Sequence, residues 1–261
     1  MNQSFYTGAL GAGTSMARMS VVANNLANVN NDGFKPKTAA FSDLLNYNLN
    51  DSENAVTELM AGNGVRMQRT YANYSTGALA PTNSAIDFAI LDNNAFFMLR
   101  DPVTEQITYT RSGHFYRAEM EDGFYLMTEG GKQVLDQNGE PLKADVPDIQ
   151  RMLEMMQEDY EPEEEEDVDE EDEDKPRIST YTFSNPSRLI SVGDNEYAAP
   201  EGMEPVLVES PQIQSGVLER SGVDLAKEMV KMIECQRAYS YALKMVQTSD
   251  EIETTINTLR G

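Results

Sequence analysis

The sequence predicts an α+β protein with a discontinuous helical domain, built from both ends of the chain, and a central, mainly antiparallel β domain. Three observations predict this class. Apolar residues recur at heptad spacing near the N-terminus and again near the C-terminus, and the chain between them consists of short β-forming runs separated by turn dipeptides. At 261 residues the chain has room for one large domain or two modest ones.

A first helix is expected from about residue 5 to residue 27 or 29. Its apolar residues follow spacings of 4, 3, 4 and 3 and so share one face: Ala12, Met16, Met19, Ala23 and Leu26. Gly33 can take the left-handed conformation that ends a helix, and Pro36 disfavours helix in the residue before it. The helix is therefore expected to stop before the chain enters the β domain.

Asparagine is dense where this helix ends, at Asn24, Asn25, Asn28, Asn30 and Asn31. Asparagine is a mediocre helix former because its side chain competes for local backbone hydrogen bonds. The first three lie off the apolar face, where their amides can bond either to backbone or to neighbouring subunits. Such bonds would give the helix end a directional preference that apolar packing lacks.

A longer helix is predicted from Leu225 towards the C-terminus, with Ser221 or Asp224 capping its first turn. Its heptad stripe comprises Leu225, Met229, Met232, Gln236, Tyr239, Leu243 and Val246. Gln236 is the one polar residue of that stripe, and a polar residue in such a position can fix the register between subunits. At 1.5 Å per residue the helix would be about 50 Å long, which is ordinary for a coiled coil. The two stripes must pair with each other, with other copies of the chain, or with both.

The central β domain is predicted from residues 86–142 and 178–208, which are rich in Phe, Tyr, Ile and Thr. Turn dipeptides within the first segment indicate a series of hairpins: Asn93-Asn94, Ser112-Gly113, Asp122-Gly123, Gly130-Gly131 and Asn138-Gly139. We expect residues 1–45 and 215–261 to form a helical assembly core. Residues 62–214 would form the β domain, interrupted by an acidic, disordered insert at 151–177.

The acidic insert accounts for much of the net charge of −24, since 14 of the 17 residues from 158 to 174 are Asp or Glu. Such a run repels itself and lacks large apolar side chains, so we expect a solvated spacer. Calcium capture is the weaker interpretation, because no EF-hand loop pattern accompanies the charge. The strong negative charge also argues against nucleic-acid binding, which needs Lys and Arg on phosphates.

Catalysis and membrane insertion find little support. A single cysteine, Cys235, and a single histidine, His114, leave little from which to build a zinc site or a Ser-His-Asp triad. Cys235 lies in the helical pattern and is expected to be a small core residue. The sequence contains no run of 18 apolar residues, and its N-terminus does not resemble a cleaved signal peptide. No catalytic residue, metal site or cofactor is predicted.

Several segments, in order, resemble the flagellar rod and hook protein family. Residues 23–35 (ANNLANVNNDGFK) are similar to the family's N-terminal pattern A-N-N-L-A-N-x-x-T-x-G-F-K, with Asn31 in place of Thr. Residues 109–115 (YTRSGHF) resemble Y-T-R-x-G-x-F, and residues 182–197 (TFSNPSRLISVGDNEY) resemble F-x-N-P-x-x-L-x-x-x-G-x-N-x-Y. The segment that begins at Glu228 (EMVKMIECQRAYSYALK) resembles E-x-V-x-M-I-x-x-Q-R-A-Y-x-x-N-x-K, without its Asn.

This resemblance implies a structural subunit of the bacterial flagellar basal body, closer to the distal and proximal rod proteins than to the larger hook protein. Such subunits form helical homo-oligomers, contact other rod and hook proteins, and leave the cytoplasm through the flagellar type III export apparatus without a cleaved signal peptide. They build a hollow tube that transmits torque. The resemblance implies neither enzymatic activity, nor nucleic-acid binding, nor direct membrane insertion.

The predicted assembly interface combines both helices and the turn after the first. It comprises Ala12, Met16, Met19, Ala23, Asn24, Asn25, Leu26, Asn28, Gly33, Phe34, Met229, Met232, Gln236, Arg237, Tyr239, Leu243 and Val246. Three alternatives stay open: a hook or hook-junction axial protein, an acidic module that binds cations or a basic partner, and a carboxylate-dependent cell-wall hydrolase.

Overall fold

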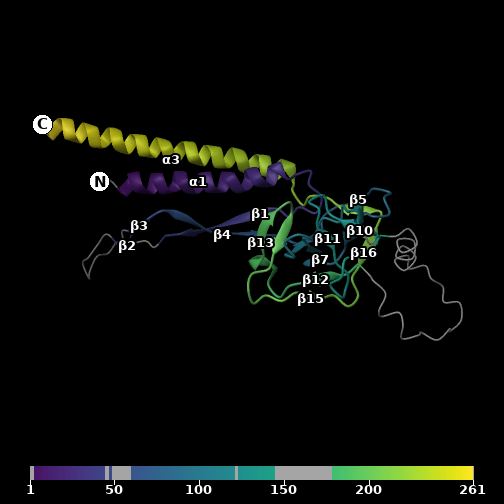
Figure 1. Ribbon diagram of the computed structural model, residues 1–261. Coiled ribbons are helices and arrows are strands. Elements are labelled where there is room, and N and C mark those ends of the chain that lie inside the picture. The colour runs from purple at the N-terminus through teal and green to yellow at the C-terminus, as the bar shows by residue number, and fades with distance from the viewer. Residues whose placement is uncertain (1–2, 45–46, 49–59, 121–122, 145–177, 261) are drawn as a thin grey trace. The chain divides into compact units, whose positions relative to one another are not determined.

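The computed structural model describes residues 3–44, 47–48, 60–120, 123–144 and 178–260 (Figure 1). The chain divides into two compact units. The helical unit comprises Met1–Val29, Pro36–Asn73 and Val223–Gly261, and the β unit comprises Asn30–Lys35 and Tyr74–Gly222. The α+β class and the antiparallel central sheet are confirmed. The predicted acidic insert at 151–177 lies outside the described residues.

Two helices and a β-ribbon form the helical unit. Helix α1 (Gln3–Ala27) and helix α3 (Leu225–Arg260) confirm the two predicted helices. The Asp224 carboxylate accepts a hydrogen bond from the Lys227 N–H at 3.1 Å, so Asp224 is the predicted cap. A hydrogen bond from the Lys227 side chain, and after it the bond from the Lys227 N–H, lower the pKa of Asp224.

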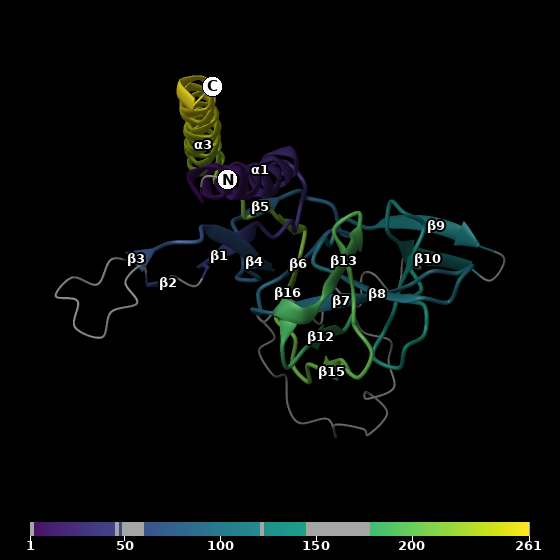
Figure 2. The same ribbon diagram turned by 90° about the vertical axis from the view of Figure 1, so that its left-hand side faces the viewer.

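The ribbon pairs β1 (Lys37–Asp43) with β4 (Val65–Ala72), and β2 (Tyr47–Asn48) pairs with β3 (Met60–Ala61). Helix α1 lies between α3 and this ribbon in both views of the molecule (Figures 1 and 2). The sequence analysis did not predict the ribbon. Strand β1 contains Lys37, Ala39 and Ala40, which are poor strand formers, and no tight turn joins β1 to β4.

The β unit is built on a nine-stranded antiparallel sheet. Its main path runs in the order β13 (Ile190–Gly193), β14 (Glu196–Ala198), β8 (Ile107–Thr110), β7 (Ala95–Arg100), β11 (Gln133–Val134), β10 (Gly123–Met127) and β9 (Tyr116–Met120). Strand β12 (Thr180–Thr182) joins β7 to β15 (Val206–Leu207). Two further pairs complete the unit: β16 (Ile213–Ser215) with β6 (Phe88–Ile90), and β17 (Val217–Glu219) with β5 (Leu79–Pro81).

Strand β7 is covered on both faces, because its successive side chains point to opposite sides of the sheet. Phe97 and Leu99 belong to one apolar cluster together with Phe88 and Phe115. On the other face, Phe96 packs edge-on against the rings of Tyr74, Phe183 and Tyr197. Burial raises the pKa of Tyr74 to about 12. The β unit therefore has a complete core of its own.

Three of the five predicted hairpin turns are confirmed, and two are wrong. Asn93-Asn94 makes no hairpin, because β6 and β7 on either side of it belong to different sheets. Strands β9 and β10 form the hairpin expected at Gly123, and Gly131 and Gly139 take positive φ angles of 78° and 80° in tight turns. Ser112-Gly113 makes no hairpin, because β8 and β9 pair with other strands. Gly113 is needed for a different reason: a Cβ there would lie 1.6 Å from the carbonyl oxygen of Phe88.

Candidate assembly surface

Helices α1 and α3 approach closely because small residues face each other. A Cβ added at Gly8 would lie 3.0 Å from Val246 Cγ2 and 3.3 Å from the Ala242 carbonyl oxygen. Besides Val246, the side of α3 that faces α1 includes residues spaced by seven: Glu228, Cys235, Ala242 and Ser249. Cys235 is 1% exposed, and burial raises the pKa of its thiol. Cys235 is thus the small core residue that the sequence predicted.

Polar bonds fix the register of the two antiparallel helices at both ends of their contact. At one end the Ser4 and Ser249 hydroxyls are 2.9 Å apart. At the other, the Asn25 amide donates to the Glu228 carboxylate at 3.2 Å. The same amide donates to the Lys37 carbonyl oxygen and accepts from the Lys37 N–H, at 2.8 and 2.9 Å. Asn25 therefore joins α1, α3 and β1 in one buried contact.

The predicted heptad stripes do not coincide with this contact. Of the predicted interface residues, the structure exposes Met16, Ala23, Asn24, Met229, Gln236, Arg237 and Leu243. It half-buries Met19, Leu26, Asn28, Met232, Tyr239 and Val246, and it buries Ala12, Asn25, Gly33 and Phe34. Of the two predicted bonding partners, backbone and neighbouring subunits, Asn25 and Asn28 use the backbone. The Asn25 side-chain amide donates to the Lys37 carbonyl oxygen, and the Asn28 side-chain amide donates to the Asn24 carbonyl oxygen at 2.7 Å. Gly33 and Phe34 belong to the β unit.

Large apolar side chains remain on the outside of both helices. Met16 is 65% exposed on α1, and Met229, Ile233 and Tyr241 are 53%, 50% and 67% exposed on α3. In most soluble proteins an amphipathic helix turns such residues towards its own core. Here small residues make the closest contacts between the two helices, and many of the larger apolar residues stay half or more exposed within the described part of the chain.

A buried charge cluster lies in the β unit, where Glu219 is paired with two cations. The Glu219 carboxylate lies 2.5 Å from Lys35 Nζ and 3.0 Å from Arg111 Nε, and all three side chains are at most 1% exposed. Arg111 also donates to the carbonyl oxygens of Asp92 and Ala95. Burial and the charge of Arg111 lower the pKa of Lys35 to about 8, against the opposing effect of Glu219.

The charge cluster ties together segments of the β unit that are far apart in sequence. Glu219 also accepts a hydrogen bond from the Gly77 N–H, and the Gly33 N–H donates to the Glu219 carbonyl oxygen at 2.6 Å. Gly33 has the expected positive φ, 67°, and a Cβ there would lie 2.7 Å from the backbone of Arg111. The G-F-K and T-R-x-G patterns noted in the sequence thus meet at one carboxylate.

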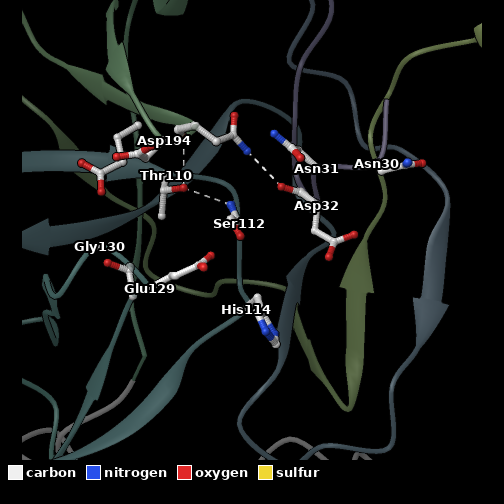
Figure 3. A pocket seen from close by; sticks show the side chains of 12 residues that line it. Asn30, Asn31, Asp32, Thr110, Ser112, His114, Glu129, Gly130 and Asp194 are labelled. Atoms are coloured by element: carbon white, nitrogen blue, oxygen red, sulfur yellow. Dashed lines mark hydrogen bonds between the residues drawn. The ribbon is translucent and has the colours of Figure 1, made fainter. Parts of the chain in front are cut away.

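A polar cavity of about 560 Å³ lies elsewhere in the β unit (Figure 3). Asp32, Glu129 and Asp194 line it together with His114, whose Nδ1 is 2.8 Å from Asp87 Oδ1. Burial raises the pKa of Asp32. Hydrogen bonds drawn in Figure 3 connect distant segments beside this cavity. The Asn195 side-chain amide donates to the Asp32 carbonyl oxygen, and the Thr110 hydroxyl donates to the Asn195 carbonyl oxygen. Within the described residues, His, Cys, Asp and Glu form no group suited to a metal ion.

Comparison with known proteins identifies the family. A model described as "Flagella basal body rod protein" matches residues 5–35, and one described as "Flagellar basal body rod FlgEFG protein C-terminal" matches residues 214–259. Flagellar basal-body rod protein FlgG of Buchnera aphidicola subsp. Schizaphis graminum is 30% identical over 268 residues, covering 97% of each chain. The chain belongs to the flagellar basal-body rod protein family.

Two other rod-family relatives match over most of their length. The rod protein FlgG of Bacillus subtilis is 28% identical, with 97% of each chain covered. The rod protein FlgF of Mesorhizobium japonicum is 27% identical, with 93% of this chain and 91% of that protein covered. Both polar contacts described above, Asn25 with Glu228 and Lys35 with Glu219, join the segment matched at residues 5–35 to the one matched at 214–259.

Sequence reasoning missed several residues of this rod-family chain that the structure brings together. Heptad spacing could have identified Glu228 and Ser249, because they lie seven residues from Cys235 and Ala242 respectively and so share their face of the helix. The glycines of α1 carried a further signal, since Gly8 and Gly11 lie three residues apart, on the same face of the helix as the predicted Ala12. Lys35, Arg111 and Glu219 come from distant segments, and no local pattern marks them as partners.

Among the described residues, no helix is long and apolar enough to span a bilayer.

Proposed function

We propose that this chain is a structural subunit of the flagellar rod that polymerises helically, through the exposed faces of α1 and α3, into the hollow axial tube. The observation that carries the proposal is the distribution of side chains on the two helices. Small residues fill the contact between α1 and α3, and large apolar residues such as Met229 and Tyr241 stay outside. Soluble monomers rarely leave large apolar patches uncovered, so neighbouring subunits are the natural cover.

Packing between copies would resemble that of coiled coils, with the exposed stripe Met229, Gln236 and Leu243 meeting helices of neighbouring subunits. Gln236 would then set the register, because a polar group in an apolar seam is stable only opposite a hydrogen-bonding partner. The other partners in this proposal are further rod and hook proteins and the flagellar type III export apparatus. The location is the basal body outside the cytoplasm, reached without a cleaved signal peptide.

The test places a charge on the exposed face of α3 in the full-length chain. We expect Met229→Glu to abolish rod completion in cells whose only copy carries the change, because a carboxylate would be desolvated between subunits. Basal bodies would be examined by electron microscopy and swimming would be scored. Val103→Glu is the matched control, since Val103 is an 87% exposed apolar residue of the β unit. Normal rods with Met229→Glu would overturn the proposal.

A further inference from the structure

A groove lies on the side of α1 that faces away from α3. It has a volume of about 460 Å³ and is lined by α1, by Leu44 just after β1, and by β4. Its apolar lining includes Tyr6, Leu10 and Ala17 of α1 and Val65 and Met67 of β4. Tyr6 and Leu10 are 50% and 44% exposed. The groove is therefore an open apolar surface with room for a few large side chains.

The walls of the groove are held in place by bonds inside the helical unit. The Thr14 hydroxyl lies 2.9 Å from the Val65 carbonyl oxygen of β4 and 2.8 Å from the Leu10 carbonyl oxygen of α1, and its one hydrogen is donated between these two acceptors. Gly13 also lines the groove, and a Cβ added there would meet no atom within 4 Å. The space beside α1 is thus open at Gly13, between the helix and β4.

The C-terminal end of α3 presents a surface that matches this groove in chemistry. Beyond Ser249, every described residue from Asp250 to Arg260 is exposed. Met245, Ile252, Ile256 and Leu259 follow spacings of 7, 4 and 3, so they share one face of the helix. Their exposed fractions rise along the helix from 43% at Met245 to 84% at Leu259. This apolar face has no cover within the described part of the chain.

The charges beside the two surfaces are complementary. Arg66 lines the groove and Arg69 follows it on β4, and both are exposed. On α3, Glu251 lies at the edge of the apolar face and is exposed. No ion pair joins Arg66 to a carboxylate among the described residues. Opposite charges at the edge of an apolar contact favour one orientation of the partner over others.

We propose that the C-terminal end of α3 in one subunit docks into the groove between α1 and the β1–β4 ribbon of the next subunit, an inference that rests on the proposed function. The subunit's own α3 packs on the opposite face of α1, at Gly8, and so cannot fill its own groove. The contact joins two different surfaces, so each subunit added leaves one free groove and one free helix end. Such head-to-tail contacts generate open helical filaments when the rotation does not close a ring.

Disulfide crosslinking in assembled rods tests the contact directly. In a Cys235→Ala background, Leu10→Cys and Ile256→Cys are combined in one full-length chain, and isolated basal bodies are oxidised. We expect a ladder of crosslinked multimers that collapses to monomer on reduction. Val103→Cys combined with Ile256→Cys is the matched control, and it should give no ladder. Normal rods that yield no ladder with Leu10→Cys and Ile256→Cys would overturn the docking proposal and leave the proposed function intact.

A charge exchange provides a test that does not need the cysteine variants to assemble. Arg66→Glu and Glu251→Arg should each reduce swimming, and combining the two should restore it towards the wild-type level. Single variants that swim normally, or a combination that swims no better than either single variant, would refute the proposed contact. Failure of the proposed function would look different, because normal rods would then form even with Met229→Glu.

Discussion

In the β unit, Phe88, Phe97 and Phe115 are each at most 2% exposed, and they pack against one another in a single apolar cluster. In the helical unit, the contact between α1 and α3 is made by residues as small as Gly8 and Cys235. The large apolar residues of α3 lie on the outside, and Met229, Ile233 and Tyr241 are each at least half exposed. The β unit therefore buries its phenylalanine cluster, whereas the large apolar residues of α3 lie mainly on the outside.

The difference shows which unit is complete as a monomer. Burying a large apolar side chain contributes about 1.5 to 3 kcal/mol to stability, so the β unit gains most of its folding energy within one chain. In the helical unit of the monomer, large apolar side chains stay exposed and contribute little to stability. In the proposed rod, contacts with other subunits would bury them. Substitutions in the β unit should therefore change the stability of the monomer, whereas substitutions on the outer faces of the helices should change assembly.

The largest effect is expected from Glu219→Gln in the β unit. The change leaves Lys35 and Arg111 buried without their carboxylate, and breaking a buried ion pair in this way costs about 3 to 5 kcal/mol. Hydrogen exchange of the β7 amides in the full chain would measure the loss, since it reports on each unit separately. Glu209→Gln, at an exposed carboxylate, should change nothing. Equal protection of β7 in both variants would show that the charge cluster does not stabilise the unit.

An intermediate effect is expected from Gly8→Leu in the helical unit. A side chain at this position meets Val246 and the Ala242 carbonyl oxygen, so the helices must separate, and overpacking of this kind costs about 1 to 3 kcal/mol. Exchange of the α1 and α3 amides should speed up, while that of β7 should stay the same. Gly13→Leu adds the same side chain where a Cβ meets no neighbour, and it should not speed up exchange. If both variants behaved alike, close packing at Gly8 would not hold the helices together.

Local patterns in the sequence predicted the elements better than they predicted which elements meet. Heptad spacing predicted both helices, and Asp224 marked the start of α3, because a helix cap depends on neighbouring residues alone. Gly33 takes the expected positive φ, but it lies six residues beyond the end of α1 and does not cap it. The face of α3 that meets α1 was not found, since an apolar stripe indicates a buried face without indicating its partner. The Lys35–Glu219–Arg111 cluster depends on contacts across more than 100 residues, which periodicity does not record.

The smallest effect on the monomer is expected from Met229→Glu, the substitution that is also expected to abolish rod assembly. Met229 is 53% exposed on α3, so the change removes little buried surface, and exposed substitutions of this kind usually alter stability by no more than about 0.5 kcal/mol. Exchange of the α1 and α3 amides should therefore match that of the unmodified chain. Faster exchange, as expected for Gly8→Leu, would mean that missing rods reflect a damaged helical unit. Unchanged exchange together with missing rods would show that the Met229 side chain is dispensable for folding of the monomer and required for assembly of the polymer.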